Sequence, residues 1–147
     1  MKFLKDIQQK KTVVGIIGLG YVGLPLAIEF AEKKFKVVGF DLDEKKIKSL
    51  SSGKSYIKHI PESKIAKIVS SKNFSATSDF SKLKNVDAIL ICVPTPLNEH
   101  REPDMSYVVK TAETVSKYLR TGQLVSLEST TYPGTTDEIL LPLFENA

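Results

Sequence analysis

The sequence contains one cysteine, Cys92, and only two arginines, Arg101 and Arg120. A single cysteine excludes an internal disulfide bond, which is typical of proteins from a reducing compartment. The net charge is +4, and lysines supply almost all of the positive charges. Proteins that read nucleic acids rely on arginine to bind guanine and phosphate, so the scarcity of arginine disfavours a nucleic-acid partner.

Long apolar segments and clustered metal ligands are missing as well. No apolar run reaches the roughly 20 residues that cross a bilayer, and residues 1–11 are polar, lysine-rich and unlike a signal peptide. The two histidines, His59 and His100, have no second histidine or cysteine at the spacing of zinc ligands. We therefore expect a soluble, cytoplasmic protein with no membrane partner and no metal site.

The length of 147 residues and the 41% hydrophobic content suit a single domain that covers residues 1–147. Apolar runs alternate with helical patterns along the chain, which predicts an α/β fold with a parallel sheet. The expected strands are 12–17, 36–40, 74–77, 86–93 and 124–127. A helix is expected directly after Gly23, and further helices at 43–50, 62–70, 104–119 and 135–144.

Right-handed crossovers between these strands predict a doubly wound, Rossmann-type sheet with the strand order 3-2-1-4-5. The six-stranded form of this fold needs one more strand after the helix at 135–144. The chain does not supply that strand. We therefore expect it to be a fragment of a longer protein.

The most informative motif is G-x-G-x-x-G at Gly18, Gly20 and Gly23, which lies between an apolar run and a helical pattern. In dinucleotide-binding folds the first glycine permits a tight turn, the second lets the backbone approach the pyrophosphate, and the third lets helix and strand pack closely. The pyrophosphate is expected at the N–H groups of the helix start, with Tyr21 and Val22 among the binding residues.

Asp41 ends the next apolar run, 18 residues after Gly23, close to the offset of about 20 expected for a carboxylate that binds the adenosine ribose. A carboxylate at that place repels a 2′-phosphate, so the predicted cofactor is NAD rather than NADP. The alternative is that the glycines only pack a generic strand–helix turn. The complete strand–helix–strand pattern favours cofactor binding.

Two further segments follow strands whose carboxyl ends should lie near the cofactor. Thr95 comes after the strand expected at 86–93, and the hydroxyl-rich segment 129–131 comes after the last strand. Ligands of open α/β sheets bind at the carboxyl ends of strands where the strand order reverses, so we expect these hydroxyls near the cofactor. The alternatives are an ordinary turn threonine and a cap of the following turn. Cys92 lies within a buried run and is interpreted as an inert small hydrophobe.

Four segments, GLGYVGLPLA, VVGFDLDEKKI, CVPTPLNEHREPDMS and SLESTTYPGTT, together resemble the UDP-glucose/GDP-mannose dehydrogenase family of nucleotide-sugar dehydrogenases. The similarity covers about residues 13–143. The third and fourth segments look closest to the bacterial UDP-N-acetylglucosamine 6-dehydrogenases, which make an N-acetylated uronic acid for surface polysaccharide.

The resemblance implies roles for single residues. It places Lys46 near the adenosine ribose and Thr95 in contact with the cofactor. Thr130 matches a family threonine at the cofactor end of the active site, which is associated with ordering a catalytic water. Arg101 and Asp104 belong to the signature of the subgroup, and Asp104 is interpreted first as a helix cap and second as a functional residue.

The resemblance also implies a reaction, the oxidation of C6 of a UDP-sugar to the acid with two NAD through an enzyme-bound thioester. The nucleophilic cysteine of the family lies in segments after the first domain, and Cys92 does not match its motif. This chain is therefore expected to bind NAD weakly and to be inactive alone, within a full-length homo-oligomer. The preferred substrate is UDP-N-acetylglucosamine.

Two kinds of alternative stay open at this point. The first keeps the enzyme class and changes the sugar to UDP-glucose, UDP-N-acetylmannosamine or UDP-N-acetylgalactosamine. The second is a stand-alone NAD-binding module without catalysis.

Overall fold

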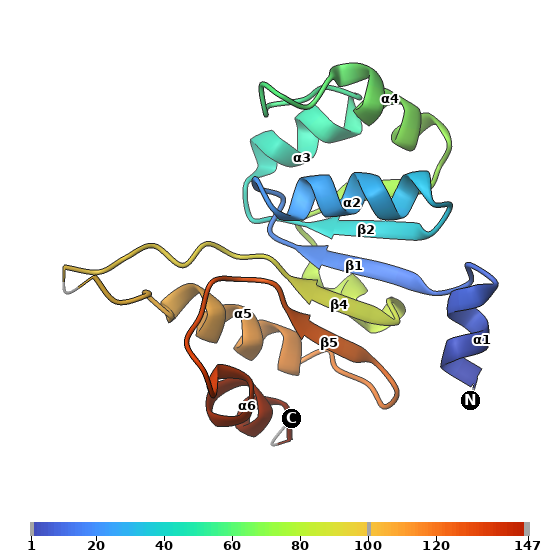
Figure 1. The fold of residues 1–147 in the computed structure, drawn as a ribbon. Coiled ribbons are helices and arrows are strands. Elements are labelled where there is room, and N and C mark those ends of the chain that lie inside the picture. The colour runs from blue at the N-terminus through green and yellow to red at the C-terminus, as the bar shows by residue number, and fades with distance from the viewer. Residues whose placement is uncertain (1, 100, 146–147) are drawn as a thin grey trace.

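The computed structural model describes residues 2–99 and 101–145. Its strands form one five-stranded parallel sheet in the order β3-β2-β1-β4-β5. This order confirms the prediction. The strands are β1 (Val13–Ile17), β2 (Lys36–Phe40), β3 (Phe74–Thr77), β4 (Ala88–Ile91) and β5 (Leu124–Leu127). Figure 1 shows α2 beside β2 with α3 and α4 above α2 in this view, and α5 beside β5 with α6 below α5. The strand order reverses between β1 and β4, which pair in parallel.

Two apolar cores lie on the two faces of the sheet. Alternate side chains of β1 point to opposite faces, so Val14 and Ile16 belong to one core and Ile17 belongs to the other. The first core contains the buried face of α2 (Gly23–Glu32), and the second contains Val115 of α5 (Ser106–Ser116). Burial from both sides explains why the central strands are near-continuous apolar runs.

The helices on the first face lie within one residue of the bounds that the sequence predicts. In α2, Leu24, Ala27, Ile28 and Ala31 form a buried stripe at helical spacing. The helix α3 (Glu44–Ser51) is capped by Asp43, whose Oδ1 accepts from the N–H of Lys45 at 2.8 Å. The helix α4 covers Glu62–Ser70. These elements fix the position of the loop between β2 and α3, which carries part of the site.

Three elements differ from the prediction. The strand β4 covers only Ala88–Ile91 of the expected 86–93, and Phe80–Asn85 before it form the short helix η1, which the apolar pattern did not indicate. The helix α5 covers Ser106–Ser116, so it begins two residues later and ends three residues earlier than the expected 104–119. The segment Lys2–Gln8 forms α1, a seven-residue helix that the sequence analysis did not predict. The last predicted helix is present as η2 (Thr136–Leu140) followed by α6 (Leu141–Glu145).

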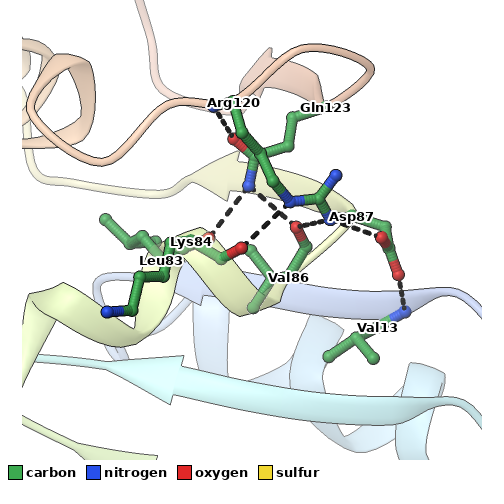
Figure 2. Close-up of polar contacts among 7 residues, drawn as sticks. All are labelled: Val13, Leu83, Lys84, Val86, Asp87, Arg120 and Gln123. Atoms are coloured by element: carbon green, nitrogen blue, oxygen red, sulfur yellow. Dashed lines mark hydrogen bonds and ion pairs between the residues drawn. The ribbon is translucent and has the colours of Figure 1, made fainter.

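A polar network joins the starts of β1, β4 and β5 (Figure 2). The guanidinium of Arg120 donates to the carbonyl of Val86 at 2.8 Å and to Oδ1 of Asp87 at 2.6 Å. The other oxygen of Asp87 accepts from the N–H of Val13 at 2.9 Å, and Gln123 donates to the same Val86 carbonyl. This network joins β1, β4 and the turn before β5 far from the carboxyl ends of the strands.

Within the described ranges, no helix has the length and apolar character needed to cross a bilayer. The same residues contain no group of three or more histidine, cysteine or acidic side chains placed to hold a metal ion. His100 lies outside the described residues.

Candidate functional site

A cleft of about 760 Å³ opens at the carboxyl ends of the strands, beside the point where the strand order reverses. The glycine turn after β1 contributes Gly18, Gly20, Tyr21 and Val22 to its lining. Other segments contribute Asp41, Lys46, Thr95 and Thr130. The fold therefore brings together residues that are up to about 110 positions apart in the sequence, because all follow the carboxyl ends of parallel strands. Gly23 is buried beneath the turn.

The three positions of the motif differ in why they hold a glycine. Gly18 has a φ of +90°, and a Cβ there would lie 2.5 Å from the carbonyl oxygen of Cys92. A Cβ on Gly23 would lie 1.8 Å from the carbonyl oxygen of Gly18. A Cβ on Gly20 would meet no protein atom within 4 Å. The first and third glycines are required by the fold, whereas the open space at Gly20 suits a ligand that approaches the backbone.

The N–H groups at the start of α2 are available to such a ligand. Among the residues that the structure describes, the N–H groups of Gly20, Tyr21, Val22 and Gly23 donate to no protein acceptor. No side chain caps this helix either. Because the dipole of a ten-residue helix adds positive potential at the same place, the turn suits the charge of a diphosphate.

Asp41 lies at the end of β2 with its side chain 10% exposed. Its Oδ2 accepts from the N–H of Leu19 at 2.9 Å and from Nζ of Lys46 at 3.1 Å. Its Oδ1 accepts from the N–H of Asp43 at 3.0 Å, which leaves this oxygen one further lone pair. The carboxylate is thus held in one orientation at the edge of the cleft and keeps capacity to accept from a hydroxyl group.

Tyr56 is a cleft residue that the sequence did not indicate, since it lies in a loop without a motif. Its hydroxyl donates to the carbonyl of Leu19, and Nζ of Lys46 lies 5.9 Å from the centre of its ring. Burial, followed by the charges of Asp41 and Asp43, raises the pKa of Tyr56. Only the chain reversal after α3 brings this side chain to the glycine turn.

The hydroxyl groups near the ends of β4 and β5 divide into two kinds. Ser129 donates to the carbonyl of Val93 at 2.8 Å, so its hydroxyl ties the two strand ends together. The side chains of Thr95 and Thr130 line the cleft, and within the described part of the chain their hydroxyls have no protein partner. These two threonines are therefore the ones free to contact a ligand.

Cys92 has the environment of a structural residue. It is 7% exposed, and burial together with the nearby Glu128 carboxylate raises the pKa of its thiol to about 11. A thiol that stays protonated near neutral pH is a poor nucleophile. This agrees with the interpretation of Cys92 as an inert residue.

Arg101, Asp104 and His59 do not line the cleft. Arg101 is exposed in the loop after β4, which extends away from the sheet (Figure 1). The N-cap of α5 is Met105, so Asp104 is not the cap that the sequence predicts but lies one residue before it. Its Oδ1 accepts from the N–H of Ser106 at 2.9 Å, and this bond lowers the pKa of Asp104. The ring of His59 stacks on Tyr21 with centroids 6.0 Å apart, beside the glycine turn.

Comparison with known proteins decides the family. Residues 12–147 match the model of the UDP-glucose/GDP-mannose dehydrogenase family, NAD binding domain. The chain belongs to this family. It is therefore an NAD-binding domain of the nucleotide-sugar dehydrogenases, as the resemblance predicted, and NAD is its cofactor.

Relatives in this family agree along nearly the whole chain. The UDP-N-acetyl-D-glucosamine 6-dehydrogenase of Pseudomonas aeruginosa is 40% identical over 142 residues, which are 97% of this chain and 32% of that protein. The UDP-N-acetyl-D-mannosamine dehydrogenase of Pyrococcus horikoshii is 38% identical over 137 residues, 90% of this chain and 32% of that protein. The chain thus spans about a third of the length of these relatives.

Solved structures of the family have the same fold. The ternary complex of GDP-mannose dehydrogenase from Pseudomonas aeruginosa aligns with a TM-score of 0.86 at 30% identity over 90% of this chain and 32% of that one. The NDP-N-acetyl-D-galactosaminuronic acid dehydrogenase of Methanosarcina mazei aligns with a TM-score of 0.84 at 34% identity, over 97% of this chain and 33% of that one.

Proposed function

We propose that this chain is the cofactor-binding part of a 6-dehydrogenase that oxidises C6 of UDP-N-acetylglucosamine to the uronic acid with two NAD. The observation that carries the cofactor part is the glycine turn, where Gly20 opens to the cleft beside unpaired N–H groups. The choice of sugar is supported by the relatives from Pseudomonas aeruginosa and Salmonella typhi, both 40% identical and both named UDP-N-acetyl-D-glucosamine 6-dehydrogenase.

In this proposal the glycine turn binds the diphosphate of NAD, and the end of β2 binds the adenosine ribose. The N–H groups from Gly20 to Gly23 donate to the diphosphate. Oδ1 of Asp41 accepts from a hydroxyl of the adenosine ribose. Lys46 is paired with Asp41 at 3.1 Å, so it neutralises part of the carboxylate while holding it in place. A 2′-phosphate would meet the carboxylate, and this favours NAD over NADP.

The threonines at the other side of the cleft serve the reacting end of the cofactor. When bound, NAD accepts a hydride at its nicotinamide ring. We assign Thr95 to contact the cofactor near this ring and Thr130 to hold a water molecule beside it. Both residues line the cleft, and their hydroxyls have no partner among the described residues.

The chain does not itself supply a nucleophile for the second oxidation. Its one cysteine is Cys92, whose thiol pKa of about 11 keeps it protonated. The proposed enzyme therefore takes its nucleophile from the part of the protein that its relatives have beyond the matched third. We expect the 147-residue chain to bind NAD and to show no dehydrogenase activity by itself.

Calorimetric titration of the chain with NAD and with NADP tests the cofactor part. We expect a measurable affinity for NAD and a weaker one for NADP. Tighter binding of NADP would contradict the role given to Asp41. Loss of all NAD binding on unfolding in urea is the control for a folded site.

Assays of the full-length protein with a panel of UDP-sugars test the substrate. The second candidate is UDP-N-acetylmannosamine, which is favoured by the 38% identical relative from Pyrococcus horikoshii. Reduction of NAD with that sugar and not with UDP-N-acetylglucosamine would replace the first proposal by the second. A full-length protein without activity on any of the sugars would favour a binding module. We also propose that the full-length protein is cytoplasmic and forms a homo-oligomer. Sedimentation of the purified protein tests the oligomer, and fractionation of cells tests the location.

A further inference from the structure

Tyr56 holds the residue at the centre of the glycine turn. Its hydroxyl donates a hydrogen bond to the carbonyl oxygen of Leu19, 37 positions earlier in the chain. Leu19 lies between Gly18 and Gly20, and its N–H donates to Oδ2 of Asp41 at 2.9 Å. Both polar backbone groups of Leu19 are therefore held by side chains from outside the turn.

The carbonyl of Leu19 belongs to the same peptide unit as the N–H of Gly20. This peptide is planar and trans, so its C=O and N–H groups lie in one rigid plane and point in opposite directions. A hydrogen bond that fixes the Leu19 carbonyl thus also fixes the direction of the Gly20 N–H. In the described part of the chain that N–H has no protein acceptor, and Gly20 lines the cleft.

We propose that Tyr56 is a positioning residue for the diphosphate of the cofactor. Its hydroxyl fixes the Leu19–Gly20 peptide so that the N–H groups at the start of α2 are oriented before the ligand arrives. This inference rests on the proposed binding of NAD at the glycine turn. Donors that are already oriented lose less conformational entropy on binding than donors that must first be ordered.

The surroundings of Tyr56 keep its hydroxyl a donor. Burial of the phenol and the carboxylates of Asp41 and Asp43 raise the pKa of Tyr56, so the proton stays on the oxygen throughout the physiological range. Lys46 lies 3.1 Å from Oδ2 of Asp41 and 5.9 Å from the centre of the Tyr56 ring. The same group of side chains therefore links the carboxylate proposed for the ribose with the turn proposed for the diphosphate.

The test compares Tyr56→Phe with the unchanged chain and with Tyr118→Phe. The phenylalanine keeps the ring and removes only the hydroxyl. Tyr118 packs in the core on the other side of the sheet and does not line the cleft, so its variant controls for the loss of a tyrosine hydroxyl. Each protein is titrated with NAD, with ADP-ribose, which keeps the diphosphate, and with adenosine, which lacks it. The ¹⁵N order parameter of the Gly20 amide is measured without ligand.

We expect Tyr56→Phe to lower the affinity for NAD and for ADP-ribose about three- to tenfold, which is the effect of one hydrogen bond. The affinity for adenosine should not change. The Gly20 order parameter should fall in this variant and stay constant in Tyr118→Phe. Equal weakening of all three ligands would overturn the proposal, because general damage to the site does not distinguish them. Unchanged NAD affinity or an unchanged Gly20 order parameter would overturn it as well. If the unchanged chain binds neither NAD nor ADP-ribose, the proposed function fails and this inference fails with it.

Discussion

Gly20→Ala should separate the folding role of the glycine motif from its binding role. The added Cβ meets no protein atom within 4 Å, and the residue does not have a positive φ. The folded state is therefore not strained. Because alanine restricts the unfolded chain, the substitution should leave the free energy of unfolding unchanged or raise it by about 0.4–1 kcal/mol.

The same methyl group lies where the diphosphate is proposed to approach the backbone. We expect NAD affinity to fall at least tenfold, which corresponds to about 1.4 kcal/mol of binding free energy. Urea unfolding followed by circular dichroism gives the stability, and calorimetry gives the affinity. An alanine variant that keeps the NAD affinity of the original chain would refute the placement of the diphosphate at this turn.

Gly23→Ala is the matched comparison within the same motif. Its Cβ would lie 1.8 Å from the carbonyl oxygen of Gly18, which is backbone and has no alternative rotamer. Overpacking of this kind costs about 1–3 kcal/mol or more, so the urea midpoint should fall clearly. The two variants thus predict opposite patterns: Gly20→Ala loses binding and keeps stability, whereas Gly23→Ala loses stability. An unchanged urea midpoint for Gly23→Ala would contradict the packing argument.

Three further outcomes are expected. Asp41→Asn removes the charge that repels a 2′-phosphate, so the ratio of NAD to NADP affinity measured by calorimetry should fall severalfold; an unchanged ratio would assign cofactor choice to another residue. Arg120→Ala removes donors to Val86 and Asp87 and should lower the free energy of unfolding by about 1–2 kcal/mol in urea, while exposed Arg101→Ala changes it little. Cys92 has its pKa raised from 9.0 to about 11 on folding, so its contribution to stability is fully present below pH 9 and is lost as the pH rises to 11. Cys92→Ala should show a flatter decline of stability across that range, and an equal decline would show that other groups cause it.

The sequence predicted the elements with strong apolar periodicity. The helices α2 and α3 follow from the local spacing of their apolar residues, which a sequence displays directly. The short helix η1 and the helix α1 were missed because neither has an extended apolar pattern. The length of β4 was overestimated for a related reason, since an apolar run marks burial and does not show which residues continue the ladder.

The candidate site was predictable only in part. The glycine turn and Asp41 belong to one strand–helix–strand unit, so their spacing in the sequence carries their meaning. Tyr56 is 37 positions from its partner Leu19 and belongs to no motif, so nothing in the sequence joins them. Ser129 and Thr130 are adjacent and chemically alike, yet only the fold shows that the Ser129 hydroxyl ties the strand ends together while the Thr130 hydroxyl has no partner among the described residues.

The sequence by itself determined the fold class, the strand order and the family, because these depend on periodicity and on motifs that act within a single unit. The tertiary structure decided the distinct reasons for the three glycines, since clashes of 1.8 and 2.5 Å arise from backbone that folds back on itself. It also decided which side chains hold the turn. Contacts between distant segments depend on how strands and loops pack in space, and spacing along the chain does not encode that packing.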